Sequence, residues 1–248
     1  MLIDAFTPDW LDKLEAAGPA YLLLDGAFIP GIHKRFGNDV RFLFEHLPGW
    51  RDAVRDVSPF MFRFDGRSLA QKQALNECSG WPMISAIRTS ESLDTLAQRL
   101  ARWCVVQAAG QHINLRFPDT RRLPDIYGVL CAEQRADMFG PAVRYSYLGR
   151  DGVWNHIALD GKVQPSQGEP KLSDEQFNEL LVSSEGDSML AQLERRSVSN
   201  SSIARSAQYS AVCAAIALGK AQKLARNEML DLCEQAMSYP QQISNQVG

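Results

Sequence analysis

The chain has 248 residues, and its 26 Lys and Arg against 29 Asp and Glu give a formal net charge of −3 at pH 7. Hydrophobic residues make up 45% of the sequence, a globular composition that excludes a wholly disordered chain and a collagen. A nucleic-acid-binding protein normally shows a basic excess or a basic face with interleaved aromatic residues. This acidic chain has neither, so we expect no nucleic-acid partner.

The five cysteines are far apart and never stand in a Cys-x-x-Cys spacing, so we expect neither a zinc site nor a disulfide framework. This use of cysteine is typical of a reducing compartment, and we expect a cytoplasmic protein. The amino terminus has no basic region followed by an apolar core, and no apolar run approaches the roughly 18 residues of a membrane span. We therefore expect no export and no membrane association.

In chain order, strand patterns alternate with helix patterns over the first 160 residues. We expect a first helix bearing Trp10, Leu11 and Leu14, then strands over 21–25, 60–64, 83–88 and 113–117. Helices are expected over 69–77, from about 92 to 103, and around Ile126 to Leu130 with an end at 138–141. Segments 143–147 and 153–157 form a closing hairpin. The patterns predict a mixed-sheet α/β lobe over residues 1–162 that is not purely parallel.

The remainder of the chain has only helical patterns. The stretch 160–170 is rich in Gly, Pro, Gln and Ser and is the predicted linker. Ser173 to Gln176 has the sequence of a capping box, and three further helices follow, the last capped by Asn227. We therefore expect a small all-α helical lobe over residues 168–248. In it, acids at 169–194 precede bases at 195–226, which indicates either an interaction face or mutual complementation of neighbouring helices.

The sequence contains no nucleotide-binding glycine loop, no nucleophile elbow and no His-Glu-x-x-His motif, so we expect no enzyme and no cofactor. One set of carboxylates keeps an alternative open. Asp25, Asp65 and Asp119 each follow an apolar strand pattern and are able to hold Mg²⁺ at one sheet edge, as in a phosphotransfer or hydrolytic enzyme. Against a metal, Asp25 and Asp65 precede glycine as turn residues do, and Asp119 lies close to Arg116 and Arg121 in the sequence.

A collinear series of segments resembles one known family. Its members in this chain are Tyr21 to Ala27, Ser58 to Phe62, Trp81 to Ser85, Leu115 to Arg121 and Phe139-Gly140-Pro141. The order and content of these segments resemble the type VI secretion adaptors, a family of effector chaperones. The central segment holds the family's Arg, aromatic, Asp and Arg as Arg116, Phe117, Asp119 and Arg121. It departs from the family pattern because Pro118 precedes Asp119 and Thr120 takes the usual place of the proline.

The resemblance implies a non-catalytic bacterial adaptor or chaperone that works by protein–protein interaction. It would bind one toxic effector and load it onto a VgrG spike protein. The implied motif and binding residues are Arg116, Phe117, Asp119, Arg121, Phe139, Gly140 and Pro141. Physically, the planar forks of the two arginines suit either pinning the fourth strand to the next helix or direct contact with a partner.

Overall fold

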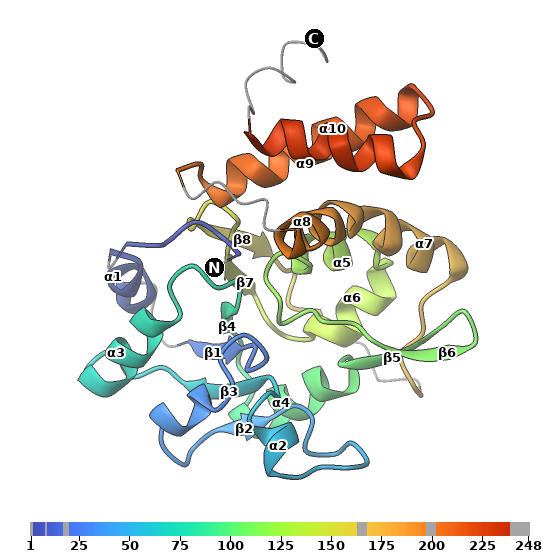
Figure 1. The fold of residues 1–248 in the computed structure, drawn as a ribbon. Helices are drawn as coiled ribbons and strands as arrows, with labels where there is room; N and C mark the ends of the chain where they lie inside the picture. The colour runs from blue at the N-terminus through green and yellow to red at the C-terminus, as the bar shows by residue number, and fades with distance from the viewer. Residues whose placement is uncertain (1, 8, 17–19, 163–167, 197–201, 239–248) are drawn as a thin grey trace. The chain divides into compact units, whose positions relative to one another are not determined.

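The computed structural model describes residues 2–7, 9–16, 20–162, 168–196 and 202–238 (Figure 1). The chain divides into two compact units, Met1–Asn178 and Glu179–Gly248. The first contains an antiparallel sheet with helices and the second contains helices, which confirms the predicted fold class. The division falls beyond the predicted linker, of which residues 163–167 lie outside the described residues. The lobe bounds 1–162 and 168–248 stay a prediction.

Six strands form the sheet of the first unit in the order β2-β3-β1-β4-β7-β8 (Figure 1). They are β1 (Tyr21–Leu24), β2 (Arg41–Phe42), β3 (Phe60–Arg63), β4 (Ile84–Arg88), β7 (Arg144–Leu148) and β8 (Trp154–Ala158). Every pairing in this sheet is antiparallel, and Leu22 lies opposite Phe62 on one side and Ala86 on the other. Both faces of the central strands are apolar because helices cover both.

Seven helices belong to the first unit in the described residues, and two of them begin at a capping serine. They are α1 (Asp9–Ala16), the 3-10 helix η1 (Ile32–Arg35), α2 (Asp52–Arg55), α3 (Leu69–Glu77), α4 (Leu93–Arg102), α5 (Leu123–Val129) and α6 (Ala132–Phe139). Ser68 and Ser92 accept hydrogen bonds from the backbone N–H of Gln71 and Thr95. The predicted bounds of α3 are confirmed, as is the start of α4.

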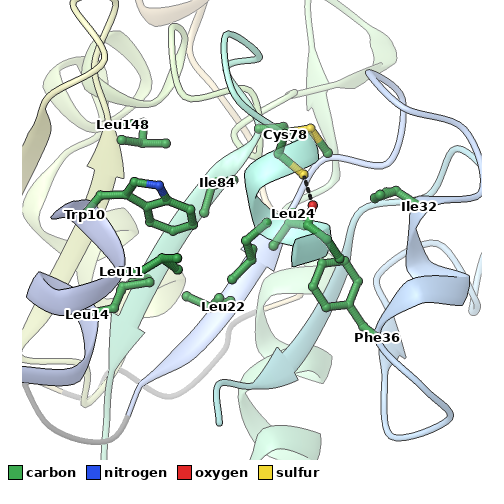
Figure 2. Close-up of a cluster of buried hydrophobic side chains, with 14 of the residues drawn as sticks. Trp10, Leu11, Leu14, Leu22, Leu24, Ile32, Phe36, Cys78, Ile84 and Leu148 are labelled. Carbon is green, nitrogen blue, oxygen red and sulfur yellow. Dashed lines mark hydrogen bonds between the residues drawn. The ribbon is translucent and has the colours of Figure 1, made fainter. Parts of the chain in front are cut away.

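One hydrophobic cluster joins α1 and α3 to one face of the sheet (Figure 2). Trp10, Leu11 and Leu14 of α1 pack against strand residues such as Leu22 and Ile84, and all are buried. The opposite face meets α4 and α6, where the Phe139 ring lies edge-on to the ring of Tyr145. The sheet is therefore packed between helices on both faces, and the candidate site lies at one edge of it, where β1 ends.

The expected strand over 113–117 is shorter and lies elsewhere. Strand β6 (Gln111–Asn114) pairs with β5 (Val105–Ala108), which the sequence analysis missed, in a separate two-stranded sheet. Positive φ angles at both turn residues, Ala109 and Gly110, suit this tight hairpin. The strand cannot continue to Phe117 because Arg116 has a left-handed backbone with φ 53°.

The expected helix through Ile126 and Leu130 is in fact two helices. Leu130 is extended, with ψ 136°, and ends α5. A new N-terminus follows, because the Gln134 side chain accepts a hydrogen bond from the Cys131 N–H at 2.9 Å. Apolar spacing alone does not reveal such a break, since both helices present apolar residues to the same core.

The second unit packs α8 (Glu185–Arg195), α9 (Arg205–Ala221) and α10 (Arg226–Ser238) around one core. The predicted capping box precedes α7 (Asp174–Ser183), where Ser173 and Gln176 exchange hydrogen bonds. The predicted cap at Asn227 is wrong, because Glu228 caps α10 by accepting from the Ala225 N–H.

The segregated charges of the second unit meet one another across neighbouring helices. Glu194 of α8 pairs with Arg205 at 2.9 Å, and Glu185 pairs with Lys220 of α9. These ion pairs favour the interpretation that the segregated charges of neighbouring helices neutralise one another, and not the interpretation that they form a face for a partner. None of the helices in the described ranges is long and apolar enough to cross a membrane.

Candidate functional site

The first element of the candidate site is the turn that ends β1. The Asp25 N–H donates to the Met83 carbonyl at 3.0 Å, and the Asp25 carboxylate accepts from the Ala27 N–H at 3.1 Å. A side chain at Gly26 would place its Cβ 2.4 Å from the Ser58 carbonyl oxygen, so only glycine fits there. This turn holds the Asp25 carboxylate at the sheet edge, almost wholly buried.

The second element is the loop from Arg116 to Arg121. The Asn114 side chain accepts from the Arg116 N–H at 3.0 Å, which stabilises the left-handed backbone of Arg116. The Asp119 N–H donates to the Arg116 carbonyl, and the Thr120 N–H donates to the Pro82 carbonyl at 2.9 Å. The loop is therefore fastened to the segment that leads into β4, and it turns the Asp119 carboxylate inward.

Asp25, Arg116, Asp119 and Arg121 together form what we call the arginine–aspartate cluster. Arg121 grips Asp119 with both arms of its fork, Nε to Oδ1 at 3.0 Å and Nη2 to Oδ2 at 2.7 Å. Arg116 Nη2 donates to Asp25 Oδ2 at 3.1 Å and lies 4.0 Å from Asp119 Oδ2. The cluster thus links the end of β1 to the loop before α5.

An aromatic side chain joins the two arginines. The Phe28 ring centroid lies 5.7 Å from the guanidinium carbon of Arg116 and 5.7 Å from that of Arg121, within cation–π range. The Trp81 ring lies 6.0 Å from Phe28. Phe28 was not among the predicted site residues, because nothing in its spacing from Asp25 distinguishes it from another loop residue.

Burial and charge together define what the cluster does. The Asp25 and Asp119 side chains are 4% and 3% exposed, whereas Arg116 is 45% exposed. Burial raises the pKa of Asp25, and the adjacent Arg116 charge acts in the opposite direction. Two carboxylates face two guanidinium groups, so the charges balance and the buried groups are paired. The cluster therefore fastens the loop before α5 to the end of β1, and its Arg116 side chain is the part that reaches solvent.

Asp65 does not join Asp25 and Asp119. Strands β1 and β3 are antiparallel, with Tyr21 opposite Arg63, so Asp65 lies beyond the other end of β1, roughly 20 Å from Asp25 along the strand direction. Its exposed carboxylate accepts from the Arg67 N–H in an ordinary turn. Within the described ranges no group of three or more His, Cys, Asp or Glu is placed to hold a metal ion. The three carboxylates of the magnesium hypothesis are therefore not brought together.

Phe139, Gly140 and Pro141 lie at and just after the end of α6. Phe139 is buried against the rings of Tyr127 and Tyr145, at 5.5 and 5.7 Å. Gly140 has φ 51°, and a Cβ there would lie 2.7 Å from Arg99 Nε. Phe117 is likewise fully buried. Of the seven predicted motif residues, Arg116 alone is exposed.

Comparison with known protein families gives one match. Residues 20–137 match the model of a domain of unknown function (DUF4123). The match contains the whole arginine–aspartate cluster with Phe28 and Trp81, and it ends in α6 just before Phe139. Neither the curated proteins nor the solved structures contain a match to the chain.

Proposed function

We propose that this protein acts by binding and not by catalysis, as an adaptor that holds a toxic effector of a type VI secretion system. In this proposal it is a cytoplasmic chaperone that loads the effector onto a VgrG spike protein, and neither nucleic acid nor membrane is a partner. The observation that carries the proposal is the match of residues 20–137 to the DUF4123 model, over the region whose ordered motifs resemble those adaptors.

The geometry of the cluster supports binding over catalysis. A general base or metal ligand needs a carboxylate that is free to accept a proton or an ion. Asp25 and Asp119 are each held by a guanidinium group, and Asp65 is remote. The cluster instead keeps the loop rigid, which suits a preformed recognition surface.

The exposed side of the cluster is the proposed contact with a partner. Arg116 is half exposed, and the partly buried rings of Phe28 and Trp81 lie beside it. Arginine and aromatic side chains are the residue types that carry most binding energy in protein interfaces. The planar guanidinium group of Arg116 would donate hydrogen bonds to carboxylates of a partner.

The test is co-expression of the full tagged chain with the toxin and the spike protein encoded by neighbouring genes. We expect affinity purification followed by size-exclusion chromatography to recover the effector with the chain. Arg116→Lys keeps the charge beside Asp25 but loses the fork, and we expect it to weaken effector binding about tenfold. Arg63→Lys, an exposed strand arginine outside the cluster, is the matched control and should bind like the wild type.

Two outcomes would contradict this proposal. In the first, neither neighbouring protein co-purifies with the chain under low or moderate salt. In the second, the chain hydrolyses a phosphoester and binds Mg²⁺ by calorimetry, with both properties lost in Asp25→Asn. That result would replace the adaptor with the metal-dependent enzyme.

A further inference from the structure

A second feature of the first unit is a small cavity with a strongly basic lining. It has a volume of about 160 Å³ and lies where α1 meets β4, β7 and β8. Its described lining residues include Lys13, Arg88, Arg144 and His156, and none of them is acidic. We call it the cationic pocket. It contrasts with the net charge of −3 of the whole chain.

The register of the sheet brings these cations together. Arg88 of β4 lies directly opposite Arg144 of β7, and Ser146 lies opposite both Ala86 and His156. Paired residues of an antiparallel sheet point to the same face, as do residues two apart on one strand. The pocket is therefore built on the face that also carries the α1 core, next to Leu14 (Figure 2).

Within the described part of the chain, the positive charges of the pocket have no acidic partners. No carboxylate of the described residues pairs with Lys13, Arg88 or Arg144, although most other strand and helix arginines of this unit have such partners. Like charges directly opposed across two strands destabilise a sheet. Burial and the nearby Arg144 and Arg88 charges also lower the pKa of His156, which keeps its ring neutral. The repulsion between Arg88 and Arg144 therefore destabilises this part of the sheet, and a bound anion would reduce that repulsion.

Two buried donors in the lining lack acceptors. Arg88 Nη2 and Trp154 Nε1 are both buried, and neither has a hydrogen-bond partner in the described structure. Leaving a buried donor without an acceptor is costly, so such groups normally have a partner. Both groups only donate, and hence the missing partner is an acceptor. The Ser146 hydroxyl and His156 Nδ1, 2.9 Å apart, satisfy each other.

Size and polarity restrict the ligand further. A cavity of about 150 Å³ holds one benzene-sized molecule, so this one takes a single small group and not a nucleotide. Leu14, Ala20, Ala86 and Trp154 supply apolar walls next to the cations. Such walls favour an organic anion over a bare, strongly hydrated inorganic one.

We propose that the cationic pocket binds a carboxylate carried on a small apolar body, with Arg88 and Arg144 donating to its oxygens and Trp154 against its apolar part. The carboxylate comes either from a free organic acid or from the C-terminus of a peptide. This inference uses only the pocket and does not rest on the adaptor function.

The probe for the test is benzoate, with benzamide as its neutral isostere, titrated into the full chain by calorimetry. We expect benzoate to bind at least about tenfold more tightly than benzamide, and less tightly as salt rises. N-acetylphenylalanine and its amide form the second arm. Tighter binding of N-acetylphenylalanine than of benzoate identifies a peptide terminus, and the reverse order identifies a free acid.

Two variants separate a binding site from a structural feature. Arg144→Gln should weaken benzoate binding about tenfold or more and also raise the melting temperature of the ligand-free protein, because it removes the charge opposite Arg88. Arg63→Gln, the same change on β3 outside the pocket, should leave benzoate binding within about twofold of wild type. Lys13→Gln, on the exposed side of α1, provides a second pocket variant.

The proposal is overturned if benzoate and N-acetylphenylalanine both bind no better than their amides. It is also overturned if Arg144→Gln and Lys13→Gln bind benzoate as the wild type does. A fall in the melting temperature of ligand-free Arg144→Gln would count against it, because that result would make Arg144 a structural residue.

Discussion

Asp119→Asn is the sharpest test of the arginine–aspartate cluster as a structural pin. The change preserves the shape of the side chain and its Oδ1 acceptor but removes the charge that Arg121 grips with two hydrogen bonds, at 3.0 and 2.7 Å. Hydrogen bonds to charged groups contribute about 1.5 to 3 kcal/mol each, and breaking a buried pair costs about 3 to 5 kcal/mol. Arg121 is 15% exposed and recovers some hydration, so we expect a loss of about 3 kcal/mol.

For a domain of this size, 1 kcal/mol shifts the melting temperature by about 2 to 4 °C, so Asp119→Asn should lower it by roughly 6 to 12 °C. Differential scanning calorimetry of the full chain measures this shift. Asp65→Asn is the matched control, because Asp65 also follows a strand and accepts a backbone N–H but is exposed and has no arginine fork. We expect it to cost less than about 0.5 kcal/mol.

The reasoning is refuted if Asp119→Asn and Asp65→Asn melt at the same temperature. If Asp119→Asn melts like the wild type and yet loses its partner, the Asp119–Arg121 pair belongs to an interface and not to the architecture.

Three further predictions concern other parts of the first unit. Gly140→Ala should destabilise the protein by more than about 1 kcal/mol, because the backbone of residue 140 has a positive φ and the new Cβ would collide with the Arg99 side chain. Gly128→Ala is the control and should be neutral or stabilising, because Gly128 lies in a helix with no atom near the new Cβ. Chemical denaturation measures the free energy of unfolding of both variants, and equal effects would contradict the predicted collision. Ser92→Ala removes the N-cap of α4 and should lower the free energy of unfolding by about 1 kcal/mol in the same assay. An unchanged denaturation midpoint would show that the cap does not stabilise the protein. Burial lowers the pKa of His33 below its ordinary value near 6.5. Below that pH the unfolded chain binds a proton at His33 more readily than the folded protein does. The free energy of unfolding therefore decreases as the pH falls below about 6.5. Melting temperatures between about pH 7.5 and 5.5 should therefore fall less in His33→Leu than in the wild type, and parallel curves would argue against this assignment.

The local elements were predictable because their signals are local. A short apolar run indicated β1, alternating apolar residues indicated β3 and the β7–β8 hairpin, and apolar residues at helical spacing after Ser92 indicated α4. The proximity of Asp119 and Arg121 also follows from their spacing, since a two-residue separation in a turn brings side chains together. In each case the determining atoms lie within a few residues of one another.

Two of the missed features come from single backbone conformations, and a third depends on the pairing of strands that are distant in sequence. Helix α5 ends at the extended backbone of Leu130, and β6 ends before the left-handed backbone of Arg116; neither conformation leaves a periodic signal. Strand direction was decisive for the carboxylates. A parallel sheet would have gathered Asp25 and Asp65 at one edge, but the antiparallel pairing of β1 and β3 separates them.

By itself, the sequence determined the fold class, the main helices and strands, and the motif that resembles a family of adaptors. Only the tertiary structure decided which charges meet. Arg116 reaches Asp25 across 91 positions, and Arg88 faces Arg144 across two strands. A charged pair is strong or costly according to burial and distance, and both are properties of the packed chain that residue order does not contain.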